Sequence, residues 1–386
     1  MFEYKVVKVD KKTRAKAGSI KTSHGNIKTP AFSPVATRAS VKTLSPEDLV
    51  DAGSQVVLGN TYHLYLRPGV TTINKFNGFG LFMGWEGPTI TDSGGYQVSF
   101  LWTKGGEENI GKVVKISDAG ATFSSYIDGS IHLLTPEKSM QIQKALGADM
   151  IMAFDQPLGS DYSKKEKKEA FQRTLKWEER SFKAWRAKKS KQALYGIVQG
   201  DTDTRLREQS LKFILQMGFP AVAMGGESIG ADPKITSKTL DSVAEILPDG
   251  LPLHALGLGG GPEGILEAVS RGIDTFDNTG ITRMARTGLL FIHPEDGGTK
   301  SNKFRTDIKR SVYKEDKKPI SRVCGCMACR NFSRAYIHHL LVSGELLGLR
   351  LTSIHNVFYI NALMSLIRKT ILAGDFESLK KHWLKT

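Results

Sequence analysis

Short apolar runs alternate with longer amphipathic segments between residues 28 and 285. Eight of the runs have the length and apolar content of buried strands. They lie at 30–36, 55–60, 88–92, 150–155, 193–199, 221–226, 253–257 and 272–277. Helical periodicity marks the segments between them. Eight successive β-then-α units favour an α/β fold, a (β/α)8 TIM barrel, over a doubly wound sheet.

Capping signals support several of the intervening helices. Ser45, Thr135 and Ser163 each precede an acidic, helix-forming segment, as N-cap residues do. Pro46 and Pro136 then occupy the first helical position, where proline is well tolerated. The sequence therefore predicts helix starts just after these capping residues.

Polar residues or glycines end most of the predicted strands. They are Asn60, Asp92, Asp155, Gln199, Gly225, Gly226 and Asp277. A single polar residue at a strand end is most simply explained as a helix N-cap. In a barrel, however, the carboxyl ends of all strands converge on the face where active sites form. Two carboxylates can divide nucleophile and acid/base roles, as in retaining glycosidic chemistry. A third carboxylate, with an amide and backbone N–H groups, suits the edge of a purine.

The organisation changes after Asp277. We expect a barrel domain over residues 1–287, with short N-terminal strands, and a small, charged, inserted subdomain over 288–356. Residues 357–386 are expected to supply the closing barrel helix, to about residue 374, and a short basic tail. The subdomain is poor in core residues, so a bound metal ion would help it to fold.

All cysteines of the chain lie within six residues, at Cys324, Cys326 and Cys329. Three clustered thiolates suit a soft metal ion, and Zn²⁺ requires a fourth ligand to complete a tetrahedron. His355 is the favoured fourth ligand, with His338 and His339 as competitors. The spacing is not that of a usual zinc finger, and the alternative is three buried, inert thiols.

Composition narrows the class of protein. The 386 residues are 40% hydrophobic, which is enough for a large core, and the net charge is +15 with a pI near 9.5. Such a charge suits a protein that binds phosphates, although it also serves solubility. The sequence lacks a long apolar segment and a signal-peptide core, so with reduced cysteines we expect a cytoplasmic protein without membrane contact.

Several motifs resemble the bacterial-type queuine/tRNA-guanine transglycosylase family. They are Gly59-Asn-Thr-Tyr-His-Leu, Thr91-Asp-Ser-Gly-Gly-Tyr-Gln-Val, Asp128-Gly-Ser, Leu134-Thr-Pro-Glu-Lys, Gly196-Ile-Val-Gln-Gly and the Cys-x-Cys-x-x-Cys…His pattern. The resemblance runs from about residue 5 to residue 372. It implies an enzyme of the queuosine pathway that exchanges the wobble guanine of a tRNA anticodon for a 7-deazaguanine, without consuming a redox or nucleotide cofactor.

The same resemblance assigns the catalytic roles. Asp277 matches the nucleophile, which attacks C1′ of the ribose and forms a covalent enzyme–RNA intermediate. Asp92 matches the general acid/base. The residue-based alternatives are that Asp277 is a strand-end cap and that Asp274 is the true nucleophile.

Binding roles follow from the resemblance as well. The purine pocket would contain Asn60, Tyr96, Asp155, Gln199, Gly225, Gly226 and Leu256, with Tyr96 and Leu256 on the two faces of the base. Arg283 and Arg286 would read the uridine beside the target, which implies a tRNA with a GU-containing anticodon. Cys324, Cys326, Cys329 and His355 would hold one structural Zn²⁺. The alternatives without a role in substrate binding are that Asp155 is a structural hydrogen-bond acceptor, that the Tyr96 ring belongs to the core, and that the two arginines lie on a solvated face.

Differences from the family pattern cluster in the pocket, at Gln156, Glu227, Ala231 and Asn278. They leave open an altered base preference, for queuine or another 7-deazapurine. A non-catalytic tRNA-binding subunit is the second alternative, although such subunits typically lose the catalytic aspartates. The family also implies a homodimer formed near the zinc subdomain.

Overall fold

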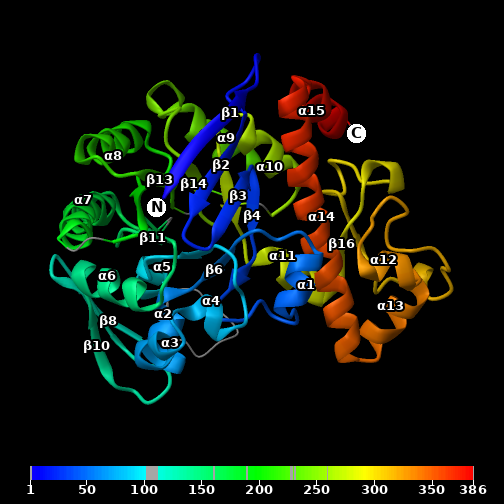
Figure 1. Cartoon of the computed structure of the whole chain (residues 1–386), viewed down its shortest axis with the longest axis horizontal. Coiled ribbons are helices and arrows are strands. Elements are labelled where there is room, and N and C mark those ends of the chain that lie inside the picture. Colours follow the sequence, from blue (N-terminus) through cyan, green and yellow to red (C-terminus); the bar gives the residue numbers. More distant parts are fainter. Residues whose placement is uncertain are drawn as a thin grey trace.

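A closed parallel barrel forms the centre of the molecule (Figure 1). The computed structural model describes residues 2–100, 112–159, 161–187, 190–226, 229, 232–258 and 260–385. The barrel strands are β4 (Ala31–Ser33), β5 (Val35–Ala36), β6 (Val57–Gly59), β7 (Thr89–Thr91), β11 (Met150–Met152), β12 (Ala193–Val198), β13 (Ala221–Met224), β14 (Leu253–Ala255) and β15 (Thr275–Asp277). Each predicted strand run contains one of them, or two in the first run, so the expected barrel is confirmed.

The ring closes through the first predicted run. β4 pairs with β15 at one edge, β5 pairs with β6 at the other, and β4 and β5 are separated only by Pro34. Proline lacks the N–H that a continuous ladder needs, which accounts for the break. Its carbonyl still accepts a hydrogen bond from Leu58 N at 3.0 Å, so the barrel wall continues across the interruption.

The predicted helix starts are confirmed. Ser45 and Ser163 form capping boxes, and Thr135 Oγ1 accepts from Lys138 N at 3.1 Å. The helices up to the end of the barrel are α1 (Pro46–Asp51), α2 (Thr61–Leu64), α3 (Val70–Lys75), α4 (Phe79–Phe82), α5 (Gly95–Phe100), α6 (Pro136–Ala145), α7 (Lys164–Arg186), α8 (Thr204–Met217), α9 (Pro233–Asp241), α10 (Pro262–Val269) and α11 (Gly280–Thr287).

An N-terminal antiparallel sheet covers the amino-terminal end of the barrel. It consists of β1 (Glu3–Val9), β2 (Lys16–Thr22) and β3 (Gly25–Thr29). Ile20 and Ile27 of this sheet are fully buried and pack with the residues that fill the barrel interior. Hydrophobic burial therefore joins the two sheets into one core.

A second antiparallel sheet, which the apolar pattern did not predict, lies between α5 and α6. Its strands are β8 (Lys112–Ser117), β9 (Gly120–Ser124) and β10 (Ile131–Leu134). Ile131 and Leu133 are 64% and 51% exposed, respectively. The strands lack the continuous apolar character of the buried barrel strands, which explains why no strong strand signal marks them in the sequence.

The C-terminal part contains β16 (Leu289–Phe291), β17 (Arg305–Asp307), α12 (Met327–Asn331), α13 (Arg334–Val342), α14 (Leu346–Ala373) and α15 (Phe376–Lys385). The expectation that the closing helix begins at 357 is wrong, because α14 begins at Leu346 and runs without interruption. The tail is also helical, and its Trp383 is buried against Tyr359 and Phe304. In Figure 1, α14 stands between the barrel and the segment with α12 and α13.

The proposed boundary between residues 356 and 357 falls inside α14. Buried residues continue along the helix on both sides of that point, from Leu351 and Ile354 to Ile360 and Leu363. One helix thus packs on the barrel and on the smaller subdomain. Within the described ranges, the chain contains no helix with the length and apolarity to cross a membrane.

Candidate active site and metal cluster

The strand-end residues gather at the carboxyl-terminal mouth of the barrel, as the sequence predicted. Asn60, Asp92 and Gln199 directly follow β6, β7 and β12, and Asp277 is the last residue of β15. All of these strands are parallel, so their carboxyl ends share one face. This face therefore brings together carboxylates and amides from strands that are far apart in sequence.

Asp92 is held by the start of α2. Thr61 N donates to Asp92 Oδ1 at 2.7 Å, and Asn60 Nδ2 donates to Oδ2 at 2.5 Å. Burial raises the pKa of Asp92 to about 7; the Thr61 N–H opposes this rise, and the charge of Asp277 adds to it. Near neutral pH the carboxyl group can therefore both give and take a proton.

Asp155 and Gln199 form a buried pair. Gln199 Nε2 donates to Asp155 Oδ2 at 2.8 Å, and Ser93 Oγ donates to Oδ1 at 2.8 Å. Burial raises the pKa of Asp155 to about 6, while the bonds from Ser93 and Gln199 lower it. A Cβ on Gly95 would lie 2.1 Å from Asp155 O, so only glycine allows α5 to approach this strand end.

Gly225 and Gly226 complete this part of the mouth. Gln199 Oε1 is buried without a hydrogen-bond partner among the described atoms, and it lies 3.0 Å from where a Gly226 Cβ would stand. Gly226 has a φ of +98°, which favours glycine. The glycines allow the backbone to pack closely against Gln199, and an orphaned acceptor there suits a ligand that brings a donor.

Asp274 directly precedes β15, whereas Asp277 is its last residue. Asp277 Oδ1 contacts His254 Nε2 at 3.1 Å and accepts from Gly257 N at 3.1 Å. Asp274 is fully buried at the amino-terminal end, where its Oδ2 pairs with Lys16 Nζ at 3.2 Å and its Oδ1 accepts from Tyr4 Oη at 2.6 Å. The alternative nucleophile is thus out of reach of the mouth.

The two residues expected to stack on the base differ in environment. Tyr96 is 50% exposed on α5, which contradicts the core alternative for its ring. Leu256 follows β14, is half-buried, and packs against the residues that fill the barrel. Its N–H donates to Met224 O at 3.1 Å, which fixes the backbone at this strand end.

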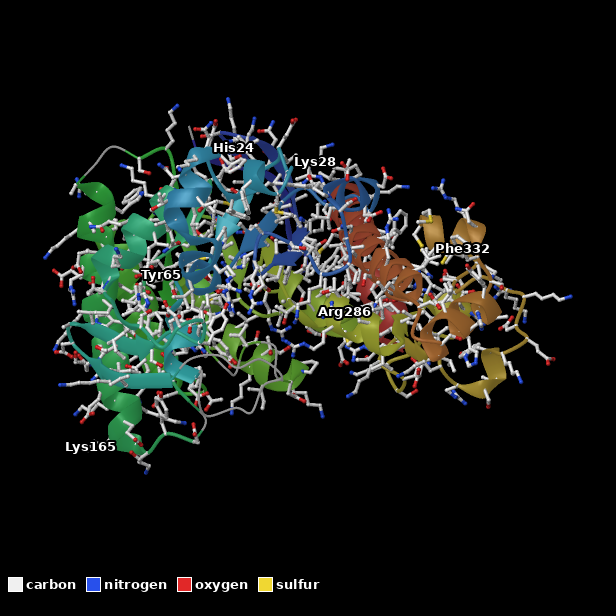
Figure 2. All side chains as sticks on the ribbon, turned by 90° about the horizontal axis from the view of Figure 1, so that it is seen from below. His24, Lys28, Tyr65, Lys165, Arg286 and Phe332 are labelled. Carbon is white, nitrogen blue, oxygen red and sulfur yellow. The ribbon has the colours of Figure 1, made fainter. Side chains whose placement is uncertain are left out.

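Arg283 and Arg286 lie on α11, the helix that follows the Asp277 strand. Arg283 is exposed and Arg286 is half-buried. Arg286 lies between the barrel and the subdomain that carries Phe332 (Figure 2). Asn278 links this connection to the mouth, since its Nδ2 donates to Gly257 O at 2.7 Å and its Oδ1 accepts from Gly280 N at 2.5 Å.

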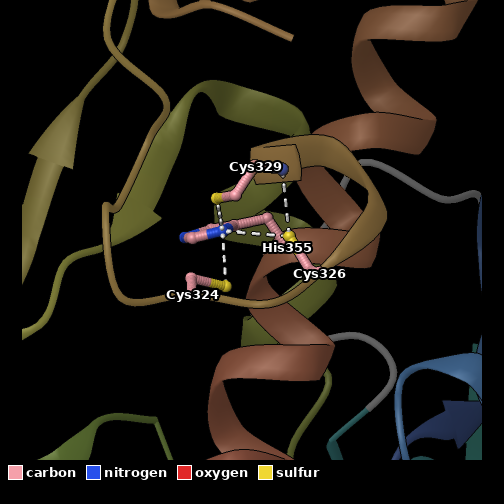
Figure 3. A group of neighbouring side chains, drawn as sticks. All are labelled: Cys324, Cys326, Cys329 and His355. Atoms are coloured by element: carbon pink, nitrogen blue, oxygen red, sulfur yellow. Dashed lines mark hydrogen bonds between the residues drawn. The ribbon is translucent and has the colours of Figure 1, made fainter. Parts of the chain in front are cut away.

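The three cysteines and His355 form one cluster (Figure 3). His355 Nδ1 lies 3.7, 3.6 and 3.3 Å from the sulfur atoms of Cys324, Cys326 and Cys329. A tetrahedral Zn²⁺ with ordinary bond lengths separates sulfur and nitrogen ligands by about 3.5 Å. His355 Nε2 contacts Phe291 O at 2.7 Å, the type of outer contact that orients a metal-binding imidazole.

The competing histidines are directed elsewhere. His338 Nδ1 contacts Ile308 O at 2.9 Å, and His339 is exposed and contacts Ser343. The expectation of a four-residue cluster that includes His355 is therefore confirmed as a possible metal site.

Sequence reasoning missed two buried residues that shape the mouth. His254 is fully buried on β14, and its Nδ1 contacts Thr275 Oγ1 at 2.9 Å while Nε2 contacts Asp277. Arg207 is fully buried on α8 and its Nη1 donates to Val198 O at 2.8 Å. A histidine inside an apolar strand was the available signal for the first; nothing in the sequence distinguished Arg207 from the surface arginines.

Comparison with known proteins agrees with this geometry. Residues 10–386 match the family described as Queuine tRNA-ribosyltransferase. The chain belongs to the queuine tRNA-ribosyltransferase family. The relative from Desulforamulus reducens is 42% identical over 99% of this chain and 97% of its own length. The relatives from Symbiobacterium thermophilum and Chromobacterium violaceum are 42% and 41% identical, over 99% and 95% of this chain and 90% and 94% of their own lengths.

All three relatives carry the name queuine tRNA-ribosyltransferase. The family resemblance inferred from the motifs is confirmed, and the chain is an enzyme of the transferase class. Two of the pocket differences, Glu227 and Ala231, lie outside the described residues. The structure does describe Gln156 and Asn278, which are the other two.

Proposed function

We propose that this chain is a tRNA-guanine transglycosylase in which Asp277 is the nucleophile and Asp92 the general acid/base. In the first half-reaction an Asp277 carboxylate oxygen bonds to C1′ of the ribose while the bond from C1′ to guanine breaks. Asp92 gives its proton to the departing purine. In the second half-reaction the incoming base attacks C1′, the bond to Asp277 breaks, and Asp92 takes up the proton of the new base.

The placement of Asp277 is the observation that carries the proposal. Its side chain ends β15 at the mouth, 12% exposed, and Oδ1 is anchored by His254 and the Gly257 N–H. Oδ2 accepts no hydrogen bond from the described residues, so one oxygen is fixed and the other is open to a ribose carbon. Such positioning lowers the entropic cost of attack.

Asp92 suits the acid/base role because of its pKa. A group that gives a proton in one half-reaction and takes one in the other works best when its pKa is near the working pH. Burial brings the pKa of Asp92 to about 7, whereas an exposed aspartate would be almost fully ionised. Asn60 and Thr61 hold its two oxygens in place.

The purine pocket is proposed to read one edge and both faces of the base. Asp155 and the orphaned Gln199 Oε1 are acceptors for purine N–H groups, and the backbone of Gly225 and Gly226 closes the space beside them. Tyr96 would cover one face of the base and Leu256 the other. A stacked aromatic ring contributes about 1–3 kcal/mol per base.

A tRNA with a GU-containing anticodon is the proposed macromolecular substrate. Arg283 and Arg286 follow the nucleophile strand and would contact the uridine beside the target guanine. Exposed basic residues of the neighbouring subdomain would contact phosphates. They are Lys300, Lys303, Lys309, Arg310, Lys314, Lys317 and Lys318.

One structural Zn²⁺ is proposed at the cysteine cluster. Cys324, Cys326, Cys329 and His355 supply the four ligands, which leaves no open position for catalysis. When bound, the ion would cross-link α12 and the segment just before it to α14. Reduced, metal-binding cysteines and a tRNA substrate also support a cytoplasmic location.

A homodimer is proposed through the face next to this cluster. Tyr336, Val342, Leu346 and Leu347 are 39%, 61%, 77% and 39% exposed on α13 and at the start of α14. Large apolar side chains gathered on adjacent helices mark a protein contact surface. Continuity with the zinc-dependent subdomain would make the dimer depend on the metal site.

The test is exchange of labelled guanine in a tRNA with a GU-containing anticodon, chased with a panel of 7-deazaguanines. The base that displaces the label is the substrate. Because the panel contains queuine and amine-bearing 7-deazaguanines, the result distinguishes between these two base preferences. Asp277→Asn should abolish both exchange and the covalent adduct while tRNA binding persists. Asp203→Asn, a matched change at an exposed helix cap, should leave both intact. Full exchange by Asp277→Asn would refute its role, and binding without any exchange would indicate a non-catalytic subunit.

A further inference from the structure

The two strands that lead to Asp155 and Gln199 stop pairing before they reach the mouth. Within the described residues, the last bond between β11 and β12 runs from Ala153 N to Tyr195 O at 2.9 Å. Ile197 N lies two residues beyond Tyr195 on the same side of β12, where a continued ladder would give it a carbonyl of β11. It donates instead to the side chain of a residue on α7, Glu178 Oε1, at 2.6 Å.

The Glu178 carboxyl group is costly to bury. The residue is fully buried, and its Oε2 has no hydrogen-bond partner among the described atoms. Burial raises the pKa of Glu178 well above its ordinary value; the Ile197 N–H opposes this rise, and the charge of Asp155 adds to it. A leucine of similar volume would avoid the cost of a half-satisfied carboxyl in the interior. The group therefore requires an explanation other than packing.

Two further buried side chains hold the backbone groups that follow Ile197 N. Arg207 is fully buried on α8, and its Nη1 donates to Val198 O at 2.8 Å. Ser210 of the same helix is also fully buried, and its Oγ accepts from Gln199 N at 3.1 Å. Three successive residues at the end of β12 are thus held by side chains from two helices.

The face of α7 that carries Glu178 also holds the end of β11. Thr174 and Ser181 lie four residues before and three residues after this glutamate, so they project from the same side of the helix. Ser181 Oγ accepts from Phe154 N at 3.0 Å, and Thr174 Oγ1 accepts from Gln156 N at 3.0 Å. These two bonds fix the backbone on both sides of Asp155.

The side chains at the two strand ends meet beyond the point where the ladder stops. Gln199 Nε2 donates to Asp155 Oδ2 at 2.8 Å. A Cβ on Gly225 would lie 2.9 Å from Gln199 Nε2 and 2.7 Å from Ile197 Cγ2, so the neighbouring strand end packs closely against both side chains. A shift of the Ile197 backbone would therefore move the Gln199 amide relative to Asp155.

We propose that Glu178 is a positioning residue for the purine pocket, which holds β12 apart from β11 through the Ile197 N–H. It thereby sets the Gln199 amide against Asp155. This inference rests on the proposed function, because it treats Asp155 and Gln199 as the groups that contact the edge of the base. The pocket is then formed before the base arrives, so binding requires no rearrangement of the strand end.

The test compares two changes at Glu178 in the full chain. Glu178→Leu removes the acceptor at similar volume and should raise the KM for guanine about tenfold, the effect of losing one buried hydrogen bond. Glu178→Gln keeps an acceptor oxygen and matches the neutral carboxyl in shape, so its KM for guanine should stay within about twofold of the unaltered value. The affinity for tRNA, to which phosphate contacts contribute most, should change by less than about twofold in either variant.

Gln192→Leu is the matched control at the other end of the same strand. Gln192 directly precedes β12, and its Nε2 donates to Gln143 O and Ala148 O at 3.1 and 2.7 Å. This change also removes a buried contact between a side chain and the backbone, but away from the mouth, so the KM for guanine should not change. If Glu178→Leu does not fold, Glu178→Met, with a more adaptable apolar side chain, takes its place.

Hydrogen exchange, measured by mass spectrometry on the peptide that contains Ile197, gives a second readout that does not depend on activity. Exchange should become faster in Glu178→Leu, because the Ile197 N–H loses its acceptor, and should stay slow in Glu178→Gln. An unchanged KM for guanine in Glu178→Leu would overturn the proposal, and so would an equal rise in Glu178→Gln. Failure of the unaltered enzyme to exchange guanine in any tRNA would instead refute the proposed function, so the two failures can be told apart.

Discussion

The rate of guanine release should depend on the protonated form of Asp92. In the proposed first half-reaction this side chain gives its proton to the departing purine. The single-turnover rate of guanine release should therefore be high at low pH, and should fall about tenfold per unit as pH rises above the pKa of about 7. Nothing else in the half-reaction requires a proton donor.

The size of the effect follows from the shift in pKa. At pH 7 an aspartate with the ordinary pKa of 3.8 is protonated in about one molecule in 1,600, whereas a pKa of about 7 leaves half protonated. Burial at the mouth thus supplies about 800-fold more of the acid form, equivalent to about 4 kcal/mol. Asn60 Nδ2 donates to Asp92 Oδ2 at 2.5 Å, and a donor at this position stabilises the ionised carboxylate.

Asn60→Ser is the informative perturbation. Serine still caps α2, as asparagine does through its contact with His63 N, but it is too short to reach Asp92. Loss of a hydrogen bond to a charged group costs about 1.5–3 kcal/mol, so the alkaline limb should move up by about one to two pH units.

The assay is rapid-quench release of labelled guanine from tRNA between pH 5.5 and 9.5, with adduct yield measured on denaturing gels. A release rate that is flat across this range in the unaltered enzyme would refute the role of Asp92. An alkaline limb at the same pH in Asn60→Ser would show that another group gives the proton.

Three further predictions concern the metal, the tRNA and the dimer. Elemental analysis should find about one zinc per chain. The Cys326→Ser variant should lose the zinc and aggregate, whereas the control His339→Ala should keep it. A folded, metal-free chain would contradict the four-ligand site. The affinity for tRNA should fall steeply as the salt concentration rises, and Arg283→Ala should weaken tRNA binding. An affinity that does not change with salt would count against phosphate contacts. Leu346→Lys should shift sedimentation towards the monomer, whereas Val114→Lys, at an exposed position on β8, should not.

The barrel was predictable because its signals are local. Each buried strand needs a run of apolar residues, and each helix start at Ser45, Thr135 and Ser163 needs its own capping side chain. The small sheet of β8, β9 and β10 escaped prediction because its strands are partly exposed and lack a continuous apolar run. The start of α14 at Leu346 was not predicted, because the helix packs on both the barrel and the smaller subdomain. The sequence interpretation assigned the helical pattern to the barrel alone.

The chemical groups of the site and the strand ends that carry them can be read from the sequence alone. Alternation of apolar and amphipathic segments requires parallel strands, and parallel strands bring Asp92, Asp155 and Asp277 to one face. The clustering of the cysteines likewise predicted the metal site before any fold was known. These properties follow from spacing along the chain.

The pKa values and the anchoring of those groups depend on contacts that form only in the folded chain. The pKa of Asp92 depends on burial and on the N–H of Thr61, and the anchoring of Asp277 depends on His254 from the neighbouring strand. The separation of Asp274 from the mouth likewise depends on folding. Desolvation and hydrogen-bond geometry arise from residues distant in sequence, so no local pattern contains them.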